Sequence, residues 1–204
     1  MKISIRKHEL AIRLQGLHRH PDAKVSLEQY TIPADLAAEI LFHACYSFGD
    51  IENKSVVDLG TGTGRLAIGA VILGADYTVG IDIDKDAVKI ASHECKGSNI
   101  DWVIGDVSVL RGKFDTVLMN PPFGTKRRHA DVRFLETALK IGNVIYSIHK
   151  TATQEFIENW LQNHNANHQI IMNTRMEIGH QFHFHRKTKY AVEVQVYRIV
   201  TTKT

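Results

Sequence analysis

The sequence has little cysteine or proline and no long apolar run. Of its 204 residues, two are cysteine and four are proline. Two isolated thiols, Cys45 and Cys95, do not make a disulfide framework, so we expect a reducing, cytoplasmic environment. Charge or glycine interrupts every apolar run before it reaches the roughly 18–20 residues that a membrane span needs. The charged residues of Met1 to Glu9 are not followed by the apolar stretch that a signal peptide would have. Neither a membrane protein nor a secreted one is expected.

The sequence also lacks a strong excess of one charge. Lysine and arginine number 25 against 22 aspartates and glutamates, which gives a formal net charge of +3. This mildly basic balance only weakly favours a nucleic-acid partner. Hydrophobic residues make up 44% of the chain and charged residues 23%, the balance of a folded globular protein. The length predicts one domain over residues 1–204.

The pattern changes from helical to alternating near residue 51. Arg6 to Leu17 and Ala34 to Phe48 carry apolar residues at helical spacing, which predicts two helices. From Val56 onward, short apolar strands alternate with helices. Strands are expected at 56–59, 77–81, 102–104, 116–119, 144–148, 169–172 and 191–200, and helices at 65–73, 85–95, 132–141 and 153–163. This order predicts an α/β fold with a mainly parallel sheet that helices cover on both faces.

A glycine-rich loop follows the first predicted strand. Residues 58–64 read Asp-Leu-Gly-Thr-Gly-Thr-Gly, and Asp82 ends the next strand. Glycines let the backbone pass close to a ligand, and an acidic residue at this point can accept hydrogen bonds from both hydroxyls of a ribose. A purely structural turn and a dinucleotide site are the alternatives. The spacing of Gly60, Gly62 and Gly64 departs from Gly-x-Gly-x-x-Gly, and Asp58 suits the ammonium group of S-adenosylmethionine better than a diphosphate.

A third aspartate ends the third predicted strand, in Ile104-Gly105-Asp106-Val107. In this class of fold the position lies beside the adenine of the cofactor, where Asp106 can accept a hydrogen bond from the exocyclic amine. Aspartates often end strands, so Asp106 alone is weak evidence for a cofactor site. The evidence is stronger because Asp58, Asp82 and Asp106 follow one another at or near the ends of successive strands. Together they favour an S-adenosylmethionine site over one for NAD.

The fourth predicted strand ends in Asn120-Pro121-Pro122-Phe123. Two consecutive prolines stiffen the backbone and remove two amide donors, which leaves carbonyl oxygens as oriented acceptors. A planar amine held between the Asn120 side-chain oxygen and a prolyl carbonyl would direct its lone pair at an activated methyl group. Phe123 offers a face on which a planar substrate can stack. The alternative is a turn that merely ends a strand.

Together these residues resemble the methyltransferase-like five group, which methylates adenine in ribosomal RNA. The resemblance extends over residues 27 to the C-terminus and includes Leu27-Glu28-Gln29-Tyr30, Asp50 to Lys54, Gly80 to Asp84, Asn120 to Lys126 and Tyr146 to Lys150. It implies a Rossmann-like class I methyltransferase fold with an antiparallel C-terminal strand. It also implies that the helical extension over residues 1–50 closes over the cofactor, with residues 51–204 as the catalytic core.

The same resemblance implies roles for individual residues. Gln29 and Ile32 would close over S-adenosylmethionine, Asn120 to Phe123 would hold the adenine, and the pocket would be lined by Gly60, Thr63, Arg65, Asp82, Asp106 and Val107. From the glycine loop itself, Asp58 and Gly64 are also expected to bind the cofactor. Thr61 and Thr63 stand where eukaryotic members have cysteines, and Thr31 where they tend to have proline, which suggests an archaeal-type or distant member. Those members work with a small zinc-ribbon activator protein, which would add a strand to an exposed sheet edge.

A histidine-rich basic run occupies residues 180–189. We expect it to contact RNA, with cations for phosphates and with aromatic or imidazole faces for bases. The expected RNA contacts are Lys126, Arg127, Arg128, His183, His185, Arg186, Lys187 and Lys189. A solvated hairpin is one alternative and a metal site is another. No metal is predicted, because zinc needs about four ligands and no cysteine lies nearby.

Three other functions fit parts of the pattern. A protein glutamine methyltransferase also presents a planar amide to Asn-Pro-Pro, although such enzymes carry Tyr rather than Phe and a separate recognition domain. DNA adenine is a further possible substrate, but no target-recognition domain is evident. A non-catalytic RNA-binding assembly factor would use the basic surface alone. The intact Asn120 motif beside an intact glycine loop favours an RNA adenine methyltransferase.

Overall fold

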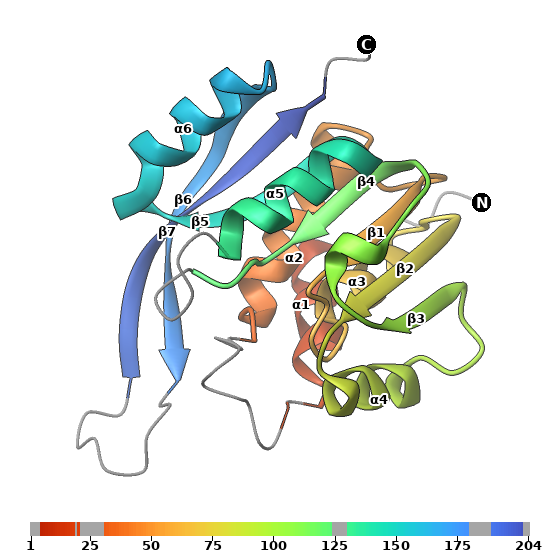
Figure 1. The fold of residues 1–204 in the computed structure, drawn as a ribbon. Coiled ribbons are helices and arrows are strands. Elements are labelled where there is room, and N and C mark those ends of the chain that lie inside the picture. Colours follow the sequence, from red (N-terminus) through yellow and green to blue (C-terminus); the bar gives the residue numbers. More distant parts are fainter. Residues whose placement is uncertain (1–4, 19, 21–30, 124–129, 180–188, 202–204) are drawn as a thin grey trace.

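The computed structural model describes residues 5–18, 20, 31–123, 130–179 and 189–201. One seven-stranded sheet has the order β3-β2-β1-β4-β5-β7-β6 (Figure 1). The strands are β1 (Ser55–Leu59), β2 (Tyr77–Asp82), β3 (Ile100–Ile104), β4 (Phe114–Met119), β5 (Gly142–Lys150), β6 (Asn167–Gly179) and β7 (Lys189–Val200). Strands β1 to β5 pair in parallel, whereas β7 is antiparallel to both of its neighbours. The predicted mainly parallel sheet with an antiparallel C-terminal strand is confirmed.

Helices cover both faces of this sheet. They are α1 (Lys7–Gln15), α2 (Ala34–Phe42), α3 (Arg65–Ile72), α4 (Lys85–Glu94), α5 (Ala130–Ile141) and α6 (Gln154–Asn163). Helices α5 and α6 lie over one face and α1, α2 and α3 over the other (Figure 1). The helix predicted over 34–48 is α-helical only as far as Phe42 and continues as a π-helix over His43–Ser47. In the described part of the chain, no helix is long and apolar enough to cross a membrane.

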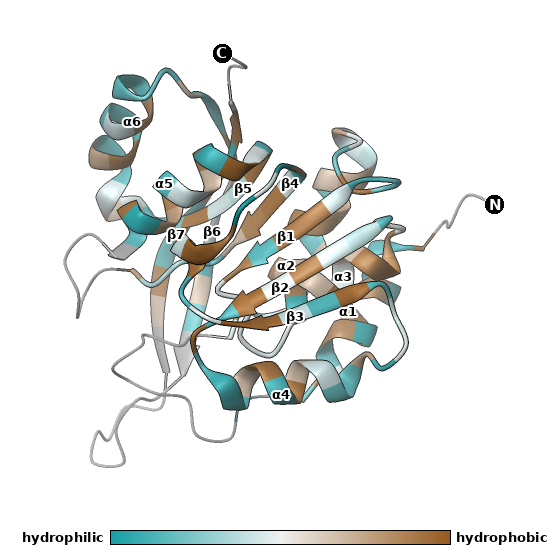
Figure 2. Ribbon diagram, turned by 45° about the vertical axis from the view of Figure 1, so that its right-hand side comes forward, coloured by the Kyte–Doolittle hydropathy of each residue, from teal (hydrophilic) through white to brown (hydrophobic). Residues whose placement is uncertain are grey.

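Alternate side chains of the central strands enter two separate cores. Tyr146 and Ile148 join the core beneath α1 to α3, whereas Ile145 joins the one beneath α5 and α6. Figure 2 shows apolar residues concentrated along the central strands, and polar residues on the outer surfaces of α4 and α6. Because both faces are covered, the inner strands carry apolar residues on both faces rather than on one alone, as strands of parallel sheets usually do.

The amino-terminal extension is part of the first core. Leu10 and Leu14 of α1 and Leu41 of α2 are fully buried there. A Cβ on Gly69 of α3 would lie 2.3 Å from a Leu41 methyl carbon, so only glycine allows these helices to approach so closely. We therefore expect α1 and α2 to fold together with the sheet rather than as a separate unit.

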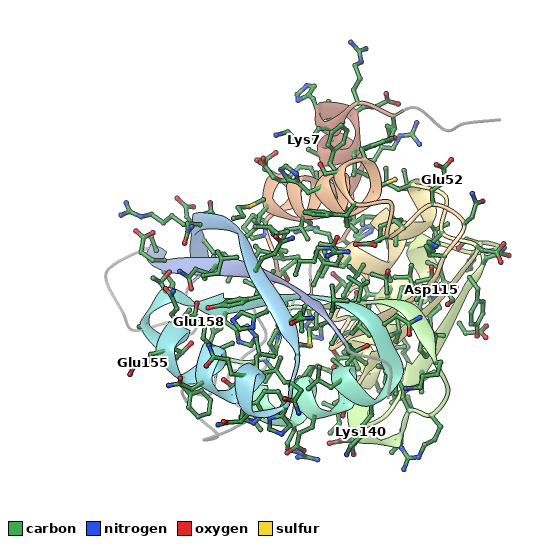
Figure 3. All side chains as sticks on the ribbon, turned by 90° about the horizontal axis from the view of Figure 1, so that it is seen from above. Lys7, Glu52, Asp115, Lys140, Glu155 and Glu158 are labelled. Atoms are coloured by element: carbon green, nitrogen blue, oxygen red, sulfur yellow. The ribbon has the colours of Figure 1, made fainter. Side chains whose placement is uncertain are left out.

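The parallel register brings four functional segments to one edge of the sheet. Leu59 pairs with both Ile81 and Met119, and Met119 pairs with Ser147. The glycine loop, Asp82, Asn120 and the end of β5 therefore all lie at the carboxyl ends of the strands, where ligands bind in open α/β sheets. Figure 3 looks at the opposite edge, where Glu52, Asp115 and Lys140 precede β1, begin β4 and precede β5.

Candidate active site

The glycine loop is held against the neighbouring strand by its backbone. The amides of Gly60 and Thr61 both donate to the carbonyl of Ile81, each at 2.9 Å. Gly60, Gly62 and Gly64 have φ values of 71°, 54° and 84°, which side chains rarely adopt. A Cβ on Gly62 would meet no atom within 4 Å, so the loop faces open space at this residue. The loop therefore has a fixed shape and leaves room for a ligand.

Close packing explains why glycine stands at Gly64, the last residue of the loop, and at Gly80 of β2. Added Cβ atoms on Gly64 and Gly80 would lie 2.6 Å and 2.5 Å from the Trp102 ring. Trp102 of β3 therefore packs directly on the backbone where α3 begins and where β2 passes. This tryptophan fixes the spacing between the loop and the neighbouring strands.

The carboxylate of Asp82 is oriented by two backbone amides. Its Oδ2 accepts from the Gly62 amide and its Oδ1 from the Asp84 amide, both at 2.8 Å. The side chain is buried, and burial raises the pKa of Asp82, with the charge of Asp84 adding to the effect. Since each oxygen has a second lone pair, the carboxylate can still accept from a ligand. Asp82 thus links the open residue of the loop to the end of β2.

Asp84 is also buried, and it caps α4. Its Oδ1 accepts from the amide of Asp86 at 3.1 Å. His20, from the segment after α1, lies 3.4 Å from the other carboxylate oxygen. The amino-terminal extension therefore contacts the protein close to Asp82.

Asp58 is turned toward the protein. Its Oδ2 accepts from the Thr61 hydroxyl at 2.7 Å and from the Ala67 amide at 3.1 Å. It thereby satisfies an amide in the first turn of α3 and ties the loop to this helix. Burial raises the pKa of Asp58 to about 7, against the opposing effect of these two hydrogen bonds. The geometry makes Asp58 a support for the loop, and its expected contact with a ligand ammonium group stays a prediction.

Asp106 lies at the end of β3 and is only partly buried. It accepts from the hydroxyl and the amide of Ser108, at 2.6 and 3.0 Å, and so begins the short helix at Val107–Val109. Arg133 of α5 forms an ion pair with it at 3.1 Å. The Ser108 hydroxyl bond, with the Ser108 amide and Arg133, lowers the pKa of Asp106. Val107, expected to line the same pocket, is buried beside it.

The segment before α2 is joined to the start of α3. The buried Arg65 side chain donates from Nη1 to the carbonyl of Ile32 at 2.5 Å. Arg65 and Thr63, both expected in the pocket, are almost fully buried. Ile32 is therefore held next to the glycine loop. Gln29, expected to close over the cofactor, lies outside the described residues.

The Asn-Pro-Pro-Phe segment follows β4 without a break. Asn120 and Pro122 are half-buried, whereas Pro121 and Phe123 are buried. Phe123 is 9% exposed and belongs to the core beneath α1 to α3. The ammonium nitrogen of Lys150, the last residue of β5, lies 5.1 Å from the centre of its ring. A base can thus stack on Phe123 only if the groups around the ring move.

Two curated relatives match this chain over nearly its whole length. The rRNA N(6)-adenosine-methyltransferase Mettl5 of Drosophila melanogaster is 40% identical over 195 residues, which are 91% of this chain and 92% of the relative. The METTL5 protein of Danio rerio, which bears the same enzyme name, is 38% identical over 95% of this chain and 98% of its own. The chain belongs to this methyltransferase-like five family.

Solved structures agree with the family. A proposed RNA methyltransferase of Pyrococcus horikoshii superposes with a TM-score of 0.90 at 43% identity, over 98% of this chain and all of the other. The protein is therefore a methyltransferase with the Rossmann-like class I fold. The family model for ribosomal protein L11 methyltransferase (PrmA) matches residues 42–120 only. That range runs from the end of α2 to Asn120 and holds the glycine loop, Asp82 and Asp106.

The sequence reasoning assigned no role to three residues at this edge. Ile83 follows Asp82 and is 54% exposed, so it presents an apolar surface beside the carboxylate. An apolar residue directly after a strand-ending acid could have indicated it. A Cβ on Gly60 would lie 2.9 Å from the Phe134 ring, and Lys150 covers Phe123. Nothing local in the sequence reveals either contact, because the partners lie on different elements.

The expected RNA contacts cannot be placed. Lys126, Arg127, Arg128, His183, His185, Arg186 and Lys187 lie outside the described residues, and of Lys189 only the backbone in β7 is described. Among the described residues, no group of three or more histidine, cysteine, aspartate or glutamate side chains is arranged to hold a metal ion. The nature of the histidine-rich run thus stays a prediction.

Proposed function

We propose that this methyltransferase transfers a methyl group from S-adenosylmethionine to the exocyclic amine of adenine in ribosomal RNA. The observation that carries the proposal is the position of Asn120. It leaves β4 beside β1, the strand that leads into the glycine loop, so the acceptor for an amine lies next to the cofactor loop. Relatives named for N6 methylation of ribosomal RNA adenosine match nearly the whole chain and support the same substrate.

The described residues fit S-adenosylmethionine. Gly62 faces open space, and the oriented carboxylate of Asp82 would accept from the ribose hydroxyls. Asp106 and Val107 would flank the adenine, with Ile83 as an apolar surface. Thr63, Gly64 and Arg65 would shape the loop from behind, and Asp58 would support it. The bound cofactor supplies a methyl group activated by its sulfonium, so the main task of the protein is orientation.

The Asn120 segment would orient the target base. The Asn120 side-chain oxygen and the Pro121 carbonyl would each accept one proton of the adenine amine, which directs the nitrogen lone pair toward the cofactor loop. Pro122 stiffens this segment, and Phe123 would stack on the base. The proton lost on methylation would pass to solvent.

Two further features complete the proposal. Residues 1–50 would close over the cofactor within a single domain, since the described parts of this extension contact Asp84 and Arg65. The basic residues at 126–128 and 183–189 would contact RNA phosphates. A small zinc-ribbon activator would add a strand beside β3, the sheet edge at which Ile104 and Val109 are exposed.

The runner-up function is protein glutamine methylation. A Methanocaldococcus jannaschii protein named for that activity is 38% identical to this chain, but over only 36% of it. Such a match covers too little of the chain to include both the cofactor loop and the β5–β7 region. RNA methylation therefore explains more of the molecule.

Labelled S-adenosylmethionine distinguishes these functions. The protein would be incubated with ribosomal RNA transcribed without modifications, with DNA, and with cell protein, each with and without a candidate activator. We expect label in RNA alone, recovered as N6-methyladenosine after digestion to nucleosides. Label in protein at glutamine, or in DNA, would overturn the proposal.

A further inference from the structure

Lys150 occupies a distinctive place at the target side of the sheet. Met119 pairs with Ser147, so Phe123 and Lys150 follow that pair by four and three residues and meet at the carboxyl edge. The ammonium group lies over the ring of Phe123, 5.1 Å from its centre. Lys150 thus covers the residue on which we propose that the target base stacks.

The backbone of Lys150 is fixed, whereas its side chain is long. Lys150 pairs with Val194 of β7, and its carbonyl accepts from the Thr153 hydroxyl at 2.9 Å. A lysine side chain is a point charge on a flexible stem, so it can leave the ring without any movement of the strand. The cation can therefore be displaced by a base.

The charge environment of Lys150 differs from that of three arginines in the described part of the chain. Arg133, Arg175 and Arg198 form ion pairs with Asp106, Glu193 and Asp50. Lys150 is half-buried, and its ammonium has neither an ion pair nor a hydrogen bond to any described residue. Among the described residues, this ammonium makes a cation–π contact with the Phe123 ring. A cation without an anionic partner, beside a proposed site for a nucleotide, suits a phosphate.

We propose that Lys150 is a substrate-binding residue that exchanges partners when RNA binds. In the free protein its ammonium covers the Phe123 ring by a cation–π contact. When the target base takes that place, the ammonium moves to the phosphate next to the target adenosine. Entry of the base is thereby coupled to recognition of the RNA backbone. This inference rests on the proposed base site at Asn120 to Phe123.

Two lysines near opposite ends of β5 provide a matched test, since Lys150 ends the strand and Lys140 lies in α5 just before the strand begins. Lys150→Met removes the charge at the carboxyl edge and keeps an unbranched apolar stem, and Lys150→Arg retains a cation. Lys140→Met makes the same change at the amino edge, where the exposed Lys140 is labelled in Figure 3. All four proteins, wild type included, would methylate unmodified ribosomal RNA in single-turnover assays at saturating S-adenosylmethionine. Salt and RNA concentration would both be varied.

Lys150→Met should raise the half-saturating RNA concentration about tenfold, with the maximal rate within about twofold. The slope of log affinity against log salt should become shallower by about 0.7, the value for one phosphate contact on a single strand. Lys150→Arg and Lys140→Met should resemble the wild type, and all variants should bind S-adenosylmethionine equally. Normal RNA affinity in Lys150→Met would overturn the inference. A loss of affinity with an unchanged salt slope would do so too, since it would mean that Lys150 merely supports Phe123.

The result also separates this inference from the proposed function. Wild-type protein that labels no RNA would contradict the function itself. Wild-type protein that labels RNA, with Lys150→Met equal to it, would contradict the role of Lys150 alone.

Discussion

The proposed cofactor side and the proposed target side of the carboxyl edge are organised in different ways. On the cofactor side, the Asp82 oxygens accept from Gly62 and Asp84, and Asp58 accepts from Thr61 and Ala67. On the target side, two prolines remove amide donors, and the ammonium of Lys150 lies on the Phe123 ring. Fixed donors and acceptors suit a small ligand of constant shape, since their orientation is set before binding. The prolines stiffen the backbone of the target side, so the group that can move there to admit a base is the long side chain of Lys150.

This difference predicts separable defects. Variants on the target side should lower methyl transfer or weaken use of RNA while S-adenosylmethionine binding persists. Variants on the cofactor side should weaken S-adenosylmethionine binding first. If a variant on one side impaired both S-adenosylmethionine binding and the use of RNA, the two sides would be coupled more tightly than their contacts suggest.

The largest effect is expected from Asn120→Ala. It removes the acceptor that orients the target amine, while Asp82 and the glycine loop keep their contacts. Single-turnover methyl transfer should fall at least about a hundredfold, the scale of losing roughly 2.7 kcal/mol of transition-state stabilisation. Calorimetry should find S-adenosylmethionine affinity little changed. Near-normal turnover would contradict the proposed mechanism.

The next effect should come from Asp82→Ala. This change removes the proposed ribose acceptor and also leaves the Gly62 and Asp84 amides without their carboxylate. The loss should amount to about 1.5–3 kcal/mol of S-adenosylmethionine binding, which is roughly a tenfold to hundredfold rise in the dissociation constant. Asp86→Ala is a control, because this acid lies in the first turn of α4. Unchanged affinity in Asp82→Ala would exclude it as the ribose ligand.

A smaller effect is expected from Phe123→Ala. Loss of stacking, worth about 1–3 kcal/mol per base, should raise the half-saturating RNA concentration by about tenfold or more. Because Phe123 also belongs to a hydrophobic core, its stability has to be measured alongside. Phe123→Leu, which keeps an apolar side chain of similar size, controls for packing and should still show weaker use of RNA. Normal RNA use by the leucine variant would show that the ring is only a core residue.

Features of the fold that depend on local sequence patterns could be predicted. The mainly parallel sheet and the glycine loop after its first strand depend on local patterns of apolar spacing and glycine, and both are confirmed. Strand β6, predicted at 169–172, instead runs from Asn167 to Gly179. It is an edge strand with many exposed polar residues and a register shift near Ile170, so its alternation is obscured.

Contacts between distant elements had no local signal. Arg133 and Asp106 are 27 residues apart, on α5 and at the end of β3, and nothing in either segment indicates the ion pair. Lys150 was recognised as part of a family-like segment, but its place over Phe123 depends on how β4 and β5 pair. Sequence patterns thus indicated which residues gather at the edge, and the register determined which of them touch.

The smallest effect on methylation is expected from Asp58→Asn, a change that tests whether the cofactor side is fixed by hydrogen bonds or by charge. Asp58 uses one oxygen, Oδ2, to accept from both Thr61 and Ala67. An amide oxygen can accept the same two bonds, so the loop should keep its shape. S-adenosylmethionine affinity should fall severalfold at most. A loss of about a hundredfold would instead show that the Asp58 charge contacts the cofactor.

The main consequence of Asp58→Asn should be a changed pH dependence of stability. Burial raises the pKa of Asp58 to about 7 in the folded protein, whereas in the unfolded chain the carboxyl titrates near about 3.9. Between these values the folded state binds more protons, so the free energy of unfolding falls as pH rises, by up to about 1.4 kcal/mol per pH unit. Asparagine does not titrate there, and urea denaturation should show a shallower fall from pH 5 to 7. Parallel curves for the two proteins would mean that Asp58 is already charged across this range, with its ionised form held by Thr61 and the start of α3.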